Sequence, residues 1–94
     1  MTDQKAVKVI RAMGFANGRH CPHVGQWLLS FDFNAHNGQG FGVFTKNPAK
    51  AMRFDDAKAA FAFWRTQSVV KPLRPDGKPN RPLTALTIEI ENVP

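Results

Sequence analysis

The stretch "QWLLSFDFNAHNGQGFGVFT", residues 26–45, decides the expected fold, because it predicts two strands joined by a turn. In its first half, large apolar side chains recur at every second position, which is the period of a strand with one apolar face. The members of this expected face are Trp27, Leu29, Phe31 and Phe33. Asn37-Gly38 suits the positive φ angles of a tight hairpin turn, after which "FGVFT" resumes the extended pattern. We therefore expect residues 26–33 and 41–45 to pair as a hairpin.

Two further strands are expected near the ends of the chain. "KAVKVIRAM", residues 5–13, fits a helical stripe or a strand, and its β-branched "VKVI" favours the strand. "LTALTIEIENV", residues 83–93, places apolar side chains at alternate positions and glutamates between them. This pattern predicts a half-buried strand with one acidic, solvated face.

The segment "KNPAKAMRFDDAKAAFAFWRTQ", residues 46–67, carries two helix starts. Asn47 can cap a short turn with Pro48 at its first position, and Asp55 can cap a longer helix. The longer helix is expected to lay an apolar stripe across the sheet. This stripe consists of Ala57, Ala60, Phe61 and Trp64.

These segments predict one α+β domain over residues 1–94. The expected architecture is a small, mostly antiparallel sheet of about four strands with one helix packed on a face, in the order β-β-β-α-β. A chain of 94 residues is too short for two independent cores. Its eight Phe and two Trp supply large side chains for burial, so we interpret most of the aromatic residues as core.

The charge balance points to anionic partners. Thirteen Lys and Arg against seven Asp and Glu give a formal net charge of +6, which attracts nucleic acid or an acidic protein surface. A single cysteine excludes an intramolecular disulfide framework and fits a reducing compartment. The N-terminal residues lack the apolar run of a signal peptide, and no stretch approaches the roughly 20 apolar residues that span a bilayer. We expect a cytoplasmic protein with no membrane partner.

The candidate interface for an anionic partner is the Pro-rich loop over residues 71–82, within "SVVKPLRPDGKPNRP". Prolines reduce the conformational entropy that a loop loses when it engages a partner. Five cations are the expected phosphate contacts: Arg74, Lys78 and Arg81 as the principal ones, with Lys71 and Arg65 in support. The alternative is a solvated loop with a Pro-Asp-Gly turn at residues 75–77, whose charges maintain solubility.

A second candidate, "RHCPHVG" at residues 19–25, concentrates potential metal ligands. The weak candidates are His20, Cys21 and His23, with His36 from the predicted hairpin loop. Structural zinc sites use two ligand pairs, and only one cluster exists here, so we expect no metal and no cofactor. Cys21 as a nucleophile would need an activated thiol and an orienting group. We expect instead that Cys21 and Pro22 seat the chain under the sheet.

Four segments together carry a family resemblance: "CPHVGQWLLSFD", "GQGFGVFTKNPAKAMRF", "AFWRTQS" and "RPDGKPNRPLTALTIEI". Across about residues 20–90 the chain resembles small uncharacterised proteins encoded in phages and prophages of proteobacteria. In these proteins an Asn/Asp-Pro-x-x-Ala-x-x-Phe segment leads into one helix. The resemblance implies no catalytic residues; it implies an accessory protein that acts by binding.

We therefore expect a non-enzymatic binding module that contacts nucleic acid through the basic loop. No carboxylate pair lies at a spacing that suggests acid–base catalysis. The alternative is a protein–protein interaction module that modulates a host or phage protein, through the same loop or an exposed sheet edge.

Overall fold

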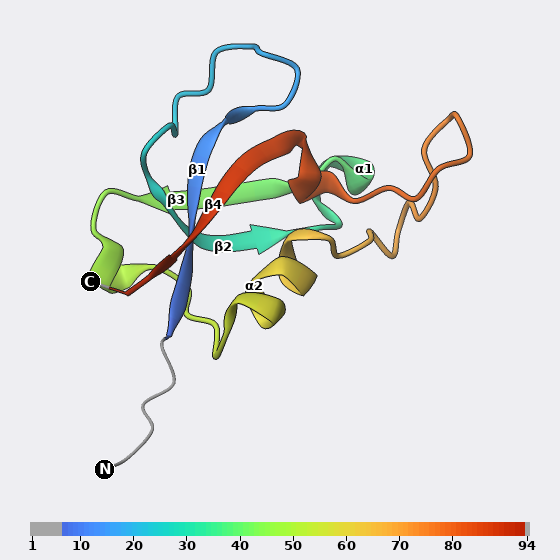
Figure 1. Ribbon diagram of the computed structural model, residues 1–94. Coiled ribbons are helices and arrows are strands. Elements are labelled where there is room, and N and C mark those ends of the chain that lie inside the picture. The colour runs from blue at the N-terminus through green and yellow to red at the C-terminus, as the bar shows by residue number, and fades with distance from the viewer. Residues whose placement is uncertain (1–6, 94) are drawn as a thin grey trace.

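The computed structural model describes residues 7–93 and contains a four-stranded sheet covered on one face by a helix (Figure 1). The sheet order is β3-β2-β1-β4, and every neighbouring pair is antiparallel. The strands are β1 (Lys8–Phe15), β2 (Trp27–Asp32), β3 (Phe41–Thr45) and β4 (Leu86–Asn92). The main helix, α2 (Ala57–Trp64), packs against β1 and β4. The α+β fold and the order β-β-β-α-β are confirmed.

Three short helical turns connect these elements. They are α1 (Ala35–Gly38), η1 (Pro48–Lys50) and η2 (Pro82–Ala85). Asn47 caps η1 as expected, because its side chain accepts a hydrogen bond from the Ala49 backbone N–H at 3.0 Å. η2 replaces the first residues of the strand predicted from residue 83. Proline at the start of η2 favours a helical turn there, so β4 begins only at Leu86.

The β2–β3 pairing is confirmed, but the connection is longer than a tight turn. Asp32 accepts a hydrogen bond from the Asn34 N–H at 2.9 Å, and Gly40 N–H donates to the Ala35 carbonyl at 2.9 Å. Between them, Asn37 and Gly38 have the expected positive φ angles of 56° and 85°. The Asn-Gly dipeptide therefore predicted correctly where the chain reverses, but the connection between β2 and β3 is longer than the tight turn that it predicted.

The apolar face expected for β2 is wrong in its first half. Leu28 is fully buried, whereas Leu29 is 38% exposed. The cause is a bulge: the pairing with β3 shifts between Leu28 and Ser30, so one extra residue resets the alternation of side chains. After the bulge, Phe31 packs against the core as predicted.

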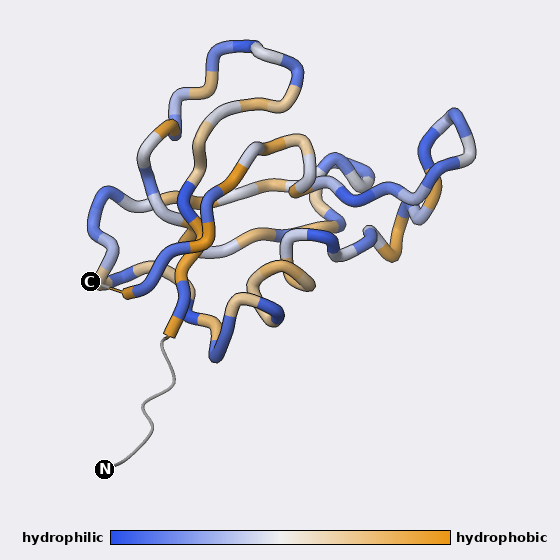
Figure 2. The backbone as a smooth tube through the Cα atoms, viewed as in Figure 1, coloured by the Kyte–Doolittle hydropathy of each residue, from blue (hydrophilic) through white to orange (hydrophobic). Residues whose placement is uncertain are grey.

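The core lies between the sheet and α2. Its buried members are Ile10, Cys21, Leu28, Ala60, Leu83 and Leu86. Figure 2 shows hydrophobic residues concentrated along β1, β4 and α2, whereas the outlying loops are mostly hydrophilic apart from exposed apolar residues at Val69, Val70 and Leu73. β1 confirms the strand predicted near the N-terminus, although residues 5 and 6 of that prediction lie outside the described part of the chain.

The helix prediction needs two corrections. The capping residue is Asp56 rather than Asp55, because the Asp56 side chain accepts a hydrogen bond from the Ala59 N–H at 2.7 Å. The expected stripe is also partly wrong, since Phe61 is 46% exposed and Phe63 packs against the core instead. The Phe63 ring meets the rings of Phe33 and Phe54 at centroid distances of 5.1 and 5.3 Å, which holds that side of α2 inward. Ala57 is exposed as well.

Candidate nucleic-acid interface

The basic loop, residues 71–82, projects from the body of the protein on the same side as α1 (Figure 1). Its two arms form a miniature hairpin: Arg74 N–H donates to the Lys78 carbonyl at 2.8 Å, and Leu73 and Pro79 form a β-bridge. The Pro-Asp-Gly turn, predicted as part of the alternative of a solvated loop, is present at the tip, where Gly77 has a φ of 84°. The loop therefore has its own hydrogen-bonded structure.

One asparagine outside the loop fixes its base. Asn34 Oδ1 accepts hydrogen bonds from Ser68 Oγ at 3.1 Å, Val69 N–H at 2.9 Å and Val70 N–H at 3.2 Å. Ser68 is 1% exposed, so its hydroxyl needs this partner inside the protein. The connection after β2 thus holds the segment that leads into the basic loop.

A second asparagine, within the loop, ties the loop to α1. Asn80 Nδ2 donates to the carbonyls of Gly38 at 2.7 Å and Lys71 at 2.9 Å. The Asn80 backbone also bonds to Pro72 and to Ser68, each at 2.9 Å. A single residue therefore joins both arms of the loop and the turn of α1.

Three of the five predicted cations gather around two adjoining hollows, which we call the basic hollows. Arg74 and Arg81 line the first, of about 350 Å³. Lys71 and Arg74 line the second, of about 280 Å³. Gln39 and Asn80 line both, so Arg74 and two neutral amide side chains connect the hollows. Arg74 also forms an exposed ion pair with Asp76, with Nη2 and Oδ2 3.1 Å apart.

The other two predicted cations lie outside these hollows. Lys78 is exposed beyond the turn at the tip of the loop. Arg65 follows the last turn of α2, and its guanidinium lies over the Phe61 ring at 5.5 Å from the centroid. Neither residue lines either of the two basic hollows.

A third hollow, which sequence reasoning missed, adjoins the basic hollows. This aromatic hollow has a volume of about 260 Å³ and is lined by Phe15, His23, Phe31, Phe41 and Phe44, among others. Gln39 and Pro82 also line the first basic hollow, so the two spaces are neighbours. Sequence analysis interpreted the aromatic residues as core. A signal that could have revealed the hollow is the pair of glycines, Gly40 and Gly42, on either side of Phe41 at the start of β3.

Three members of the other candidate site, Cys21, His23 and His36, serve packing. Cys21 is 4% exposed and belongs to the core cluster, as expected for a residue that seats the chain under the sheet. His23 stacks on Phe44 at 4.5 Å, and His36 lies edge-on to Phe41 at 5.9 Å, while His20 is exposed. Within residues 7–93, no three His, Cys, Asp or Glu side chains form a group that could hold a metal ion.

One cation near the sheet is already paired. Arg11 Nη1 lies 3.4 Å from Glu91 Oε2, and its guanidinium lies 5.0 Å above the centre of the Trp27 ring. Trp27 Nε1 donates to Glu91 Oε1 at 3.0 Å. Burial raises the pKa of Glu91, but hydrogen bonds from Glu89, Trp27 and Arg11 outweigh it, so this pKa is lowered overall. The pKa of Glu89 is raised by its hydrogen bond to Glu91 and by the Glu91 charge.

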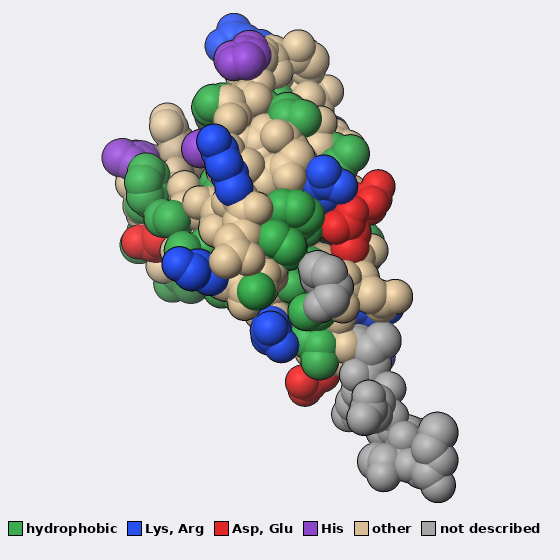
Figure 3. Space-filling view, turned by 90° about the vertical axis from the view of Figure 1, so that its left-hand side faces the viewer, with side chains coloured by type: hydrophobic (Ala, Val, Ile, Leu, Met, Phe, Trp, Pro, Cys, Tyr) green, Lys and Arg blue, Asp and Glu red, His purple; other side chains and the backbone are tan. Residues whose placement is uncertain are grey.

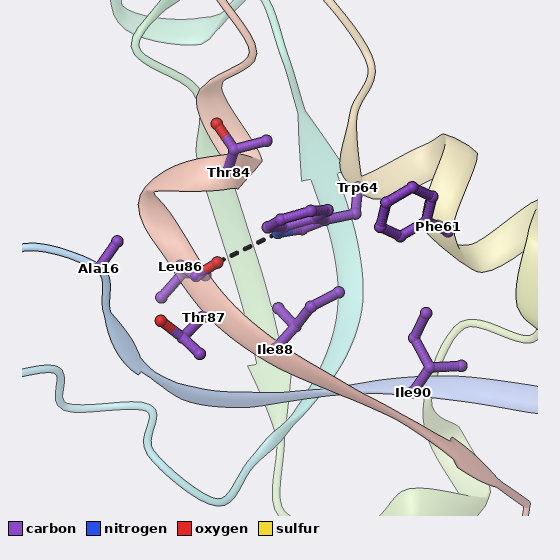
Figure 4. A pocket seen from close by; sticks show the side chains of 8 residues that line it. All are labelled: Ala16, Phe61, Trp64, Thr84, Leu86, Thr87, Ile88 and Ile90. Atoms are coloured by element: carbon purple, nitrogen blue, oxygen red, sulfur yellow. Dashed lines mark hydrogen bonds between the residues drawn. The ribbon is translucent and has the colours of Figure 1, made fainter.

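An apolar groove of about 430 Å³ runs between α2 and β4 (Figure 4). Phe61 and Trp64 reach into it from the helix, and Ile88 and Ile90 face them from the strand. Trp64 Nε1 donates to the Leu86 carbonyl at 3.1 Å and fixes the indole in place. β4 is an outer strand of the sheet, and no further strand pairs with its outer edge among residues 7–93, so the groove follows a strand edge.

The side of the molecule away from the basic loop differs in how its positive charges are distributed. Figure 3 shows Lys and Arg side chains standing apart on that face, and the atoms drawn for described residues form no continuous basic patch there. Among residues 7–93, no helix is long and apolar enough to cross a membrane.

No protein family, curated protein or solved structure matches the chain. The fold and the candidate site therefore define only a structural class of protein. This class is a small α+β protein that presents a braced basic loop beside an aromatic hollow.

Proposed function

We propose that the protein is a non-enzymatic nucleic-acid-binding module that grips the phosphate backbone through its basic loop. Lys71, Arg74 and Arg81 are the main phosphate contacts, and Lys78 and Arg65 support them. The observation that carries this proposal is the gathering of three cations around two adjoining hollows that share Gln39 and Asn80.

The chemistry of these side chains suits phosphate. An arginine presents a planar fork of N–H donors that matches phosphate oxygens, whereas a lysine contributes a compact positive charge. The amide of Gln39 adds a neutral donor around the same space, while both N–H groups of the Asn80 amide hold the loop. Because Asn34 and Asn80 already hold the loop, less conformational entropy is lost on binding than for a free loop.

The non-enzymatic part of the proposal is supported by the lining of the basic hollows. The described residues around them include no cysteine, histidine or carboxylate to act as nucleophile or base. Two further parts rest on sequence alone: a cytoplasmic location and a role as an accessory protein of a phage or prophage.

The proposal is tested by fluorescence anisotropy with labelled nucleic acid and nuclease-treated protein. Arg74→Ala combined with Arg81→Ala is compared with Lys46→Ala combined with Lys50→Ala, which removes the same charge from an exposed region after β3. We expect the arginine pair to weaken binding by more than about tenfold, since it removes charge-assisted hydrogen bonds, and the lysine pair to weaken it much less. Equal effects of the two pairs would refute the loop as the contact surface.

A second candidate function rests on the apolar groove beside β4. An extended peptide can add a strand to a free sheet edge, and its alternate apolar side chains then fill the pockets beside that edge. The groove between α2 and β4 has this arrangement, with Phe61 on its rim 46% exposed. A protein partner that is retained at high salt after nuclease treatment, and lost with Phe61→Glu, would favour this function. Retention by the Phe61→Glu variant would exclude the groove.

A further inference from the structure

We propose that the aromatic hollow binds one unpaired nucleobase, so that the nucleic acid recognised by this protein is single-stranded. This inference rests on the proposed function, because it takes the neighbouring basic hollows as the phosphate site. It adds a base-binding site and a strand preference to that function.

The arrangement of the three hollows matches the parts of a nucleotide. Gln39 lines the aromatic hollow and both basic hollows, and Pro82 and Ala85 line the aromatic hollow and the first basic one. A base in the aromatic hollow would thus lie directly beside a phosphate held by Arg74 and Arg81. Proteins that bind single strands combine these two features: a basic track for the backbone and aromatic rings for the bases.

One ring of the aromatic lining, that of Phe41, offers a surface that the core does not use, whereas Phe15, Phe31 and Phe44 also pack against the core. Phe41 is 54% exposed, although it is a large apolar side chain. Phe44 is backed by the stacked ring of His23 at 4.5 Å, and Phe41 is backed edge-on by His36 at 5.9 Å. Neighbouring rings hold these side chains in place, so that a base can stack without first ordering them.

Two glycines of the β3 region keep the lining close to the backbone. A Cβ atom at Gly40 would lie 2.5 Å from the Phe31 ring and 2.8 Å from Pro82 Cβ. A Cβ atom at Gly42 would lie 2.8 Å from the Phe44 ring and 3.0 Å from that of Phe31. Side chains at these positions would displace Phe31 and Phe44, two of the rings that line the hollow.

The hollow selects an unpaired base for a simple physical reason. A base within a duplex is stacked on both faces and paired along its edge, so it must be extruded at a cost before it can enter a pocket. In a single strand both faces and the edge are free. Gln39 can then donate and accept hydrogen bonds at the base edge, because its amide carries both functions.

The test measures binding of fluorescein-labelled oligodeoxythymidine of about ten nucleotides, an abasic strand of the same length and the corresponding duplex. The protein variants are Phe41→Ala and Gln39→Ala, and Phe61→Ala is the matched control, because it removes an exposed phenylalanine from the other groove. All residues changed are exposed, and circular dichroism verifies that each variant retains its fold.

We expect wild-type protein to bind the thymidine strand at least about fivefold more tightly than the abasic strand, the effect of one stacked base. Phe41→Ala and Gln39→Ala should reduce this preference, and Phe61→Ala should preserve it. Equal binding of the two strands, with the Arg74→Ala, Arg81→Ala protein still weakened, would overturn the base site and leave the phosphate site standing. Absence of binding to any probe at low salt would overturn both.

Discussion

At the level of single residues, two asparagines hold the basic loop in place. Asn34 accepts three hydrogen bonds from the segment that enters the loop, and Asn80 joins both arms of the loop to α1. Sequence analysis singled out neither residue. The reason is physical: the partners of Asn34 lie 34 to 36 positions further along the chain, so no local pattern could show the contact.

Asn34→Ala tests the brace directly. The substitution leaves the buried Ser68 hydroxyl and two backbone N–H groups without their acceptor, which should lower the free energy of unfolding by about 1–3 kcal/mol. Asn34→Asp is the matched control, because it keeps an oxygen at the accepting position and should stay closer to wild type. Urea denaturation measures both variants. An Asn34→Ala protein as stable as wild type would show that the brace contributes nothing.

The cluster of Arg11, Trp27 and Glu91 makes stability depend on pH in a defined direction. The lowered pKa of Glu91 means that the native state binds fewer protons than the unfolded state in the acid range. Its contribution is therefore present above the ordinary glutamate pKa and is lost as the pH falls through the lowered value. The raised pKa of Glu89 acts with the opposite sign, favouring the folded state only while Glu89 is protonated.

Glu91→Gln should lower stability at neutral pH and flatten its decline in acid. Glu89→Gln should not lower stability at neutral pH, because it removes a repulsion from Glu91. Thermal unfolding followed by Trp fluorescence, from neutral pH into the acid range, measures both effects. An acid decline that is as steep in Glu91→Gln as in wild type would show that another group is responsible.

At the level of elements, the sequence predicts the strands and the helix well, because their signals are local. Alternating residues mark β4, and Asn47 before Pro48 marks η1. The errors arise where one residue shifts a pattern: the bulge after Leu28 reverses the faces of β2, and α2 turns Phe63 inward in place of Phe61. A shift of this kind depends on pairing and packing across the sheet, which a local pattern does not contain.

For the candidate site, too, local features could be predicted from the sequence, whereas contacts between distant segments could not. The five cations and the Pro-Asp-Gly turn were visible in the sequence, because charge and turn residues are local properties. The gathering of Lys71, Arg74 and Arg81 was not visible, since it depends on contact between the loop and α1. The aromatic hollow was missed for the same reason, because its lining comes from separate strands and loops.

Gly38→Ala tests the contact between α1 and the basic loop, with Gly77→Ala as its control. Both glycines have φ angles near 85°, so both substitutions carry similar backbone strain. A Cβ atom at Gly38 would also lie 2.6 Å from Lys71 Cβ, whereas nothing lies within 4 Å at Gly77. We expect Gly38→Ala to lower the melting temperature more than Gly77→Ala, and also to weaken nucleic-acid binding. Equal effects of the two substitutions would contradict close packing of α1 against the loop.

At the level of the whole molecule, the positive charge is unevenly distributed over the surface. Lys71, Arg74 and Arg81 line adjoining hollows on the side of the basic loop, although Arg74 also pairs with Asp76 in an exposed ion pair, whereas the side shown in Figure 3 carries separated cations. The apolar groove lies between α2 and β4, and its lining includes none of the cations of the basic loop. The protein thus presents two surfaces of different chemistry, of which the basic one carries the proposed function.

The salt dependence of binding tests this central claim most directly. Each phosphate neutralised on a single strand contributes about 0.7 to the slope of log affinity against log salt concentration. Anisotropy titrations of oligodeoxythymidine over a range of salt concentrations should therefore give a clear slope for wild type. The slope of the Arg74→Ala, Arg81→Ala protein should be smaller by about 1.4, the share of two phosphates. An unchanged slope in that variant would show that the nucleic acid binds elsewhere and would contradict the account.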